Sequence, residues 1–220
     1  LGGLFLILTA AAPAAQAAIG VTFIPPDQWG LPDEDLGLGG GVVEDFEDIA
    51  LAPGLLVEIA DSAGEFNGIG SPTLPAVFDP VNGDPWGDSF TAGIWDGSAV
   101  LVNTETNQSI YYGSADWRAV RFHLPDGVTW FAVATQQVTG NHSLLVNVQP
   151  VGRLQGLGMP LGAGRNGVMV VSSDDPLVPI VSVSFGGGGD AFVVDHVVFE
   201  PADTVPVRQA RWGGIKALFR

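Results

Sequence analysis

Three short runs of β-forming residues follow one another closely between Arg165 and Phe199. The runs are Gly167–Ser172, Ile180–Phe185 and Phe192–Phe199. All three are rich in Val or Phe, and Ser alternates with apolar residues in the second, as in a strand with one buried face. An Asp-Pro turn and a glycine loop separate the runs and leave no room for a helix between them. This segment is therefore predicted to form part of an antiparallel sheet.

The same pattern covers most of the chain. Seven further runs predict strands: Val42–Phe46, Leu55–Ala60, Ala99–Asn103, Ser109–Tyr112, Ala119–Leu124, Thr129–Thr135 and Ser143–Gln149. Turn sequences such as Pro125-Asp126-Gly127 separate them at intervals of roughly 8–12 residues, which is typical of sandwiches. We therefore predict an all-β, antiparallel, jelly-roll-like sandwich of about ten strands. Because the chain has no cysteine, its core must hold together without disulfides.

Composition divides the chain into five segments. In residues 1–17 an apolar run precedes Ala15-Gln16-Ala17, the A-x-A pattern of a signal peptide cleavage site. Without an initiator Met or a basic first region, the sequence is expected to start inside that signal peptide, and the mature form to have no transmembrane segment. Residues 18–41, rich in Gly, Pro and acids, are predicted to be a flexible lead-in. The sandwich then spans 42–200, followed by a linker, 201–207, and a cationic tail, 208–220.

Charge is distributed unevenly along the chain, whose formal net charge is −16. The tail holds Arg208, Arg211, Lys216 and Arg220 and no acid, so the preceding residues contain 24 acidic and 4 basic side chains. Such an acidic surface repels phosphate backbones, which argues against nucleic-acid binding. It favours solubility, and it would attract divalent cations.

Several sequence motifs resemble those of a known family. They are VVEDFE at residue 42, AVRFHLPDGVTWFAVAT at 119, SLLVNV at 143, GVMVVSSDDPLVPIVSVSF at 167 and AFVVDHVVF at 191. Together they resemble the secreted bacterial β-sandwich domains of the PEP-CTERM and choice-of-anchor type, over Val42–Phe199. The resemblance implies an extracellular or surface sandwich, usually non-enzymatic. The sequence after Phe199 departs from that family, because no PEP motif, transmembrane segment and Arg cluster follow.

The tail, RQARWGGIKALFR, resembles the pattern Trp-Gly-x-Ile-Lys-x-Leu-Phe-Arg that closes many exported proteins of Gram-negative lineages. The matching residues are Trp212, Gly213, Ile215, Lys216, Leu218, Phe219 and Arg220. The apolar members are spaced as on one helix face, although so short a helix is unstable without a partner. The tail is predicted to be a sorting or attachment signal recognised by surface machinery. The alternative is a short helix docked on its own sandwich.

Residues typical of catalysis are scarce. The three histidines are His123, His142 and His196, and the last is expected to project opposite to its neighbour Asp195. No nucleophile elbow, zinc motif or phosphate loop occurs in the sequence. A secreted hydrolase would need a pair of carboxylates in a cleft or a His-Ser pair, and remains an alternative.

Calcium is the most specific cofactor that the sequence suggests, because Ca²⁺ prefers carboxylate and amide oxygens. The acids of the opening strand are predicted to meet Asp195 on the closing strand, which interrupts an apolar run; they are Glu44, Asp45, Glu47 and Asp48. Of these, Asp45 and Glu47, with Asp195, are the positions that match the family-like motifs. A second possible site is the loop containing Asp79, Asn82, Asp84 and Asp88. The alternative for both groups is solvated acids or Asx turns.

Aromatic residues in the irregular, acidic part of the chain suggest a second ligand. Trp86 and Trp95, with Asp84 and Asp88 beside them and Tyr111 and Tyr112 behind, could form a sugar-binding face. The alternative for each ring is burial in the core. We therefore expect an exported, non-catalytic surface or extracellular sandwich, structural or adhesive, and stabilised by calcium. A carbohydrate-binding module that contacts extracellular polysaccharide is the first alternative.

Overall fold

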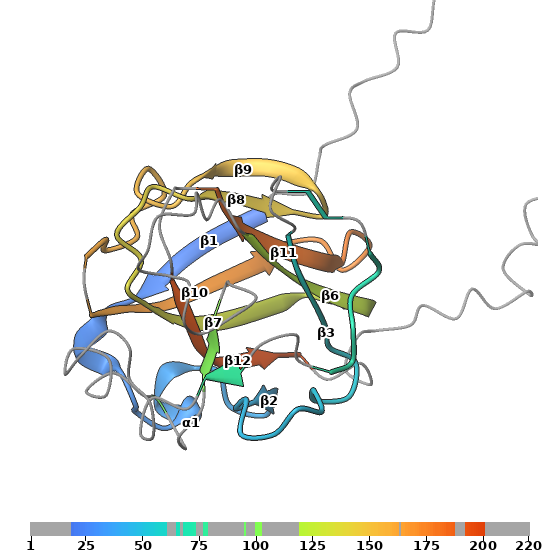
Figure 1. The fold of residues 1–220 in the computed structure, drawn as a ribbon, viewed down its shortest axis with the longest axis horizontal. Helices are drawn as coiled ribbons and strands as arrows, with labels where there is room; N and C mark the ends of the chain where they lie inside the picture. Colours follow the sequence, from blue (N-terminus) through green and yellow to red (C-terminus); the bar gives the residue numbers. More distant parts are fainter. Residues whose placement is uncertain are drawn as a thin grey trace, which may run out of the picture.

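The computed structural model describes residues 19–60, 65–66, 68–73, 77–78, 95, 100–102, 119–162, 164–187 and 192–200. Over these residues the chain forms twelve strands in two antiparallel sheets, with one 3-10 turn, η1 (Pro26–Gln28), and one short helix, α1 (Asp33–Leu36) (Figure 1). The predicted all-β antiparallel sandwich is confirmed, with twelve strands in place of about ten. None of the described helices is long and apolar enough to cross a membrane.

The seven-stranded sheet contains the closing strand at its centre. Its order is β1 (Ile19–Ile24), β10 (Arg165–Ser173), β7 (Trp130–Gln136), β12 (Val193–Phe199), β5 (Val100–Val102) and β4 (Val77–Phe78), and β2 (Val42–Glu44) also pairs with β12. The five-stranded sheet has the order β3 (Leu56–Ile59), β6 (Ala119–Val128), β11 (Ile180–Gly186), β8 (Ser143–Val146) and β9 (Gln149–Arg153). From β5 onward nearly every connection passes from one sheet to the other, as in a jelly roll.

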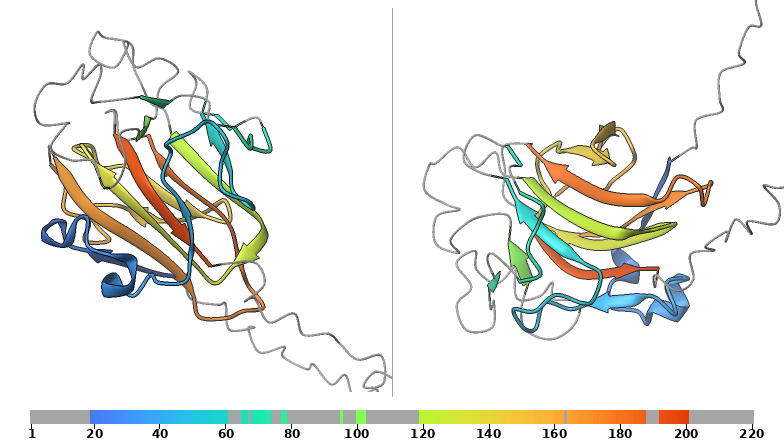
Figure 2. Two further views of the ribbon diagram at one scale, coloured as in Figure 1. Left: turned by 90° about the horizontal axis from the view of Figure 1, so that it is seen from below. Right: turned by 90° about the vertical axis from the view of Figure 1, so that its right-hand side faces the viewer.

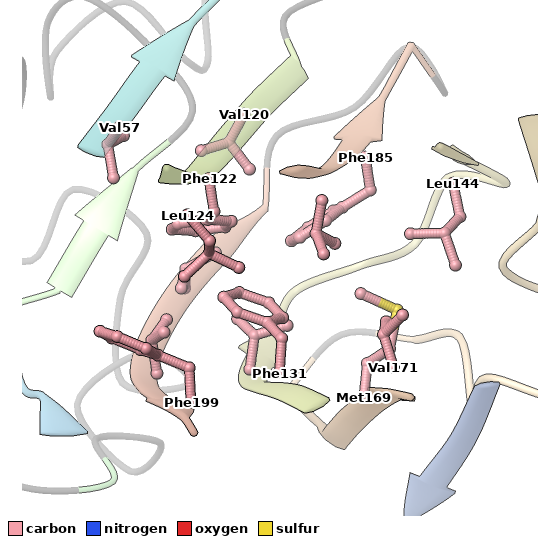
Figure 3. Packing of buried hydrophobic residues seen from close by; sticks show 14 of the residues in the cluster. Val57, Val120, Phe122, Leu124, Phe131, Leu144, Met169, Val171, Phe185 and Phe199 are labelled. Atoms are coloured by element: carbon pink, nitrogen blue, oxygen red, sulfur yellow. The ribbon is translucent and has the colours of Figure 1, made fainter. Parts of the chain in front are cut away.

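One apolar core lies between the two sheets, which face each other in Figure 2. Phe122 on β6 is fully buried, and its ring lies 5.3 Å from that of Phe131 on β7 and 6.4 Å from that of Phe185 on β11 (Figure 3). Because β6 and β7 belong to opposite sheets, this aromatic contact joins the two layers. Period-2 alternation puts Val120, Phe122 and Leu124 on the buried face of β6.

The prediction that residues 18–41 form a flexible lead-in is wrong for the described residues 19–41. β1 pairs with β10 over six residues, and its alternating Ile19, Val21 and Phe23 pack against the core. The chain then turns over the outer face of the seven-stranded sheet, where Trp29 and Leu38 join a second apolar cluster. The alternation of Ile19, Val21 and Phe23 was the signal for a strand in the sequence, but the Gly- and Pro-rich composition of the segment obscured it.

This crossing brings backbone close to the sheet at two glycines. A Cβ at Gly167 would collide with the carbonyl oxygen of Ile24, and its φ of +96° also favours glycine. A Cβ at Gly41 would collide with the side chain of Val198. Both glycines are therefore needed where the first segment lies against the sheet.

One predicted turn and one predicted strand differ from the structure. The predicted turn Pro125-Asp126-Gly127 lies within β6. Val128 pairs with Ile180 of β11, but His123, five residues earlier, pairs with Ser182, so the intervening residues of β6 form an irregularity in the pairing. The chain reverses direction at Thr129. The predicted strand 143–149 is instead a hairpin of β8 and β9, with Asn147 and Val148 at φ of 52° and 60°. Positive φ at both positions is the signature of a type I′ turn. The predicted strand 109–112 lies outside the described residues.

Candidate functional site

β12 carries a bulge at Asp195 and His196. Its pairing with β7 changes from Val194–Thr135 to Val197–Val133, so two residues of β12 lie opposite one residue of β7. Such a bulge redirects side chains that would otherwise alternate. Both residues therefore reach the same neighbour, Trp95, and the expectation that His196 projects opposite to Asp195 is wrong.

We call the residues around this bulge the Trp95 cluster: Trp29, Asp33, Trp95, Asp195 and His196. Asp195 Oδ2 accepts a hydrogen bond from the backbone N–H of Trp95, and the His196 ring stacks on the Trp95 ring with centroids 5.1 Å apart and planes at 14°. His196 Nε2 lies 2.9 Å from Asp33 Oδ1, and Trp29 meets Trp95 at 5.0 Å and 66°. The cluster thus fastens the segment around η1 and α1 to the centre of the seven-stranded sheet.

The sugar-binding prediction included Trp95, whose ring is partly buried and is engaged within the protein by His196 and Trp29. It is therefore not a free stacking platform in this structure. Trp86, Asp84 and Asp88, as well as Tyr111 and Tyr112, lie outside the described residues. A sugar face built on those residues stays a prediction.

The acids of the opening strand are used mainly in local turns. Asp45 Oδ1 accepts from the N–H of Glu47 at 3.1 Å, and Asp48 Oδ1 accepts from the N–H of Ala50 at 2.7 Å. These are the Asx turns that stood as the alternative to calcium. Within the part of the chain that the structure describes, no three His, Asp or Glu side chains are grouped to hold a metal, so Asp45, Glu47 and Asp195 do not form the expected triad. Calcium binding stays a prediction, and Asp79, Asn82, Asp84 and Asp88 lie outside the described residues.

Glu44, by contrast, is buried beside this turn. Its two carboxylate oxygens accept hydrogen bonds from the backbone N–H groups of Phe46 and Ala52. The pKa of Glu44 is raised, chiefly because burial disfavours the charged carboxylate and also because the charges of Asp45 and Asp48 lie nearby, against the opposing effect of these two hydrogen bonds. Glu44 therefore closes the loop after β2 and has a structural use that sequence reasoning missed.

His123 lies in a polar group on the outer face of the five-stranded sheet. Glu58 Oε2 lies 3.1 Å from His123 Nε2 and 3.7 Å from Arg121 Nη1, and Glu58 Oε1 accepts from the N–H of Gly68. The Arg121 guanidinium lies 3.9 Å from the centre of the Phe66 ring. This group therefore holds Phe66 and Gly68 against β3 and β6.

His142 is fully buried at the end of the sandwich opposite the β6–β7 reversal. Its ring meets the edge of the Phe192 ring at 5.1 Å, and burial lowers its pKa to about 4, against a smaller opposing effect of its hydrogen bond to the backbone of Gly186. A neutral imidazole is therefore part of the core at pH 7.

Removing the Trp95 ring tests the role of the cluster. We expect Trp95→Ala to speed amide hydrogen exchange in residues 26–38 while exchange in β6 and β11 stays close to that of the wild type, because the ring joins Trp29 to His196. Ile69→Ala, a change at an exposed site near β3, is the control. Equal acceleration in every strand would show that Trp95 supports the whole fold and not this attachment.

Comparisons of this chain with models of known protein families, with curated proteins and with solved structures returned no match.

Proposed function

We propose that this protein is an exported, non-catalytic β-sandwich that works at the bacterial cell surface or outside the cell, as a structural or adhesive domain attached through its C-terminal tail. The observation that carries the proposal is the use of all three histidines. His123 and His196 each pair with a carboxylate that holds a segment on a sheet, and His142 is buried with a depressed pKa. The side chains best suited to general base catalysis near pH 7 thus have structural partners.

The positions of the two chain ends support attachment. β1 begins at Ile19, which pairs with Ser173. Glu200, which follows β12, accepts a hydrogen bond from the N–H of Thr129, and the carbonyl of Thr129 accepts one from the N–H of Ser173. The first and last described residues therefore lie at one end of the sandwich (Figure 2, right). A domain tethered at that end keeps its opposite end available to the surroundings.

Deleting residues 208–220 tests the attachment. In the organism that makes the protein, we expect the truncated chain to be exported but released to the medium, while the intact chain stays with the cells. Trp212→Ala and Lys216→Glu should have the same effect, because they remove the aromatic and cationic features of the tail. Immunoblots of the cell and medium fractions provide the measurement, with Ala217→Ser as the matched control.

The cell fractions, together with binding and activity assays on the purified protein, separate the alternatives. Equal retention of intact and truncated chains would contradict attachment through the tail. Binding to insoluble polysaccharide that is lost in Trp86→Ala would instead make the protein a carbohydrate-binding module. Release of soluble sugar from such a polymer would make it a hydrolase and overturn the non-catalytic role.

A further inference from the structure

Four exposed aliphatic side chains lie on two neighbouring turns and the start of β11, at the end of the sandwich where the first and last described residues lie. We call them the apolar end patch: Val148, Leu177, Val178 and Val181, which are 56%, 69%, 41% and 42% exposed. Val148 lies in the β8–β9 turn, Leu177 and Val178 in the β10–β11 turn, and Val181 at the start of β11. Exposed aliphatic residues in isolation are common, whereas a group of them marks an interaction surface.

Asn147 holds the two turns together. Its side-chain N–H donates to the carbonyl of Pro179 at 2.9 Å, and its Oδ1 accepts from the N–H groups of Val181 and Ser182 at 2.7 and 3.2 Å. Val148 follows directly in the chain. These hydrogen bonds therefore hold the turn that carries Val148 against the segment that carries Val178 and Val181.

Val148 is unusual at its position. Its φ is 60°, in a type I′ turn whose second central residue is most often glycine. A β-branched residue with positive φ is strained, and such strain is found mainly where the side chain serves a function. The turn thus displays an exposed apolar side chain at a conformational cost.

The C-terminal segment leaves the sandwich beside this patch. Glu200 contacts Thr129, the Thr129 carbonyl accepts from Ser173, and the Ser173 hydroxyl donates to the carbonyl of Val178 at 2.8 Å. The linker, 201–207, extends to at most about 25 Å. The tail that follows can therefore reach the patch without any change in the sandwich.

Charge also matches. The patch, with the neighbouring residues in the segments 124–128 and 173–181, contains three acidic residues and no Lys or Arg. The acids are Asp126, Asp174 and Asp175. The tail contains four basic residues and no acid, with Trp212, Ile215, Leu218 and Phe219 as its large apolar side chains. An apolar surface with an acidic rim is complementary to such a segment.

We infer that the tail, residues 208–220, folds back and packs its apolar side chains on the apolar end patch of its own chain, with its basic residues toward the acidic rim. The tail is then covered until an attachment partner displaces it. This docking does not depend on what the protein is attached to, and its failure would leave the proposed surface function untouched.

A spin label provides the test, because the chain has no cysteine and one introduced residue is labelled uniquely. In full-length Ala217→Cys carrying a nitroxide, we expect the methyl NMR signals of Leu177, Val178 and Val181 to be broadened. Signals of Leu144 and Val193, at the opposite end of the sandwich, should stay sharp. Added salt should reduce the broadening, because it screens the tail from the acidic rim.

Val148→Gly is the decisive variant. It gives the turn its preferred residue, so it should raise the melting temperature and still weaken the broadening at Leu177, which a merely damaged fold would not do. Ile69→Ser, a change at an exposed apolar residue near β3, should leave the broadening unchanged. Sharp signals at the patch in the wild type would overturn the inference. So would broadening only between separate labelled and isotope-enriched chains, which would mean that a second copy covers the patch.

Discussion

Replacing Phe122 with alanine is expected to lower the free energy of unfolding by about 3–5 kcal/mol. The side chain is fully buried and meets Phe131 of the opposite sheet and Phe185 of its own sheet (Figure 3). Its removal would leave a cavity at the contact between the layers, which a close-packed sandwich cannot fill by collapse. For a domain with a typical total of about 5–15 kcal/mol, this loss brings the protein close to unfolding.

Guanidinium unfolding followed by tryptophan fluorescence measures this change. Phe122→Leu, which keeps most of the apolar volume, should be clearly less destabilising, and Ile69→Ala at an exposed site should change the free energy by no more than about 0.5 kcal/mol. If Phe122→Ala cost no more than Ile69→Ala, the two sheets could not be held together through this aromatic contact.

Acidification from pH 7 to pH 4 is expected to remove about 3 kcal/mol of stability through His142 alone. In the folded protein burial lowers the pKa of His142 to about 4, whereas its ordinary value is 6.5. Between these two values the unfolded chain binds the proton and the folded chain does not. Stability is therefore complete above about pH 6.5 and falls as the pH drops toward 4.

His142→Gln isolates this effect, because it removes the titrating group and keeps a polar side chain. Its unfolding free energy should be lower than that of the wild type at pH 7, yet fall less between pH 7 and pH 4, with a difference of about 3 kcal/mol between the two drops. Other groups, including Glu44, titrate in both proteins and cancel in that difference. Parallel pH profiles would show that His142 is protonated in the fold without penalty.

The fold class was accessible from the sequence because strand patterning is local. The three runs between Arg165 and Phe199 became β10, β11 and β12 with ends shifted by two residues or fewer. β1 was missed because only its alternation, at Ile19, Val21 and Phe23, argued for a strand beside a Gly- and Pro-rich stretch. Pairing with β10 decided that segment, and pairing is a long-range property.

The candidate site shows the same limit. Asp195 stood out in the sequence as a carboxylate in an apolar run, but its partner is the backbone of Trp95, one hundred residues away. Alternation assigned His196 to the opposite face, and the bulge on β12 brought it to the same side. A bulge depends on the register between two strands, which one strand's residues do not reveal.

By itself, the sequence determined that this chain is an antiparallel β-protein without disulfides, because periodicity and residue counts act locally. Tertiary structure alone decided which acids and histidines meet, and that residues 19–24 join a sheet while the residues after them, to 41, cover its outer face. It also decided that the turn carrying Val148 lies beside the start of β11, where Val181 lies. Those outcomes depend on which strands become neighbours and in which register. Both are chosen by the burial of the whole core, to which each segment contributes only a part.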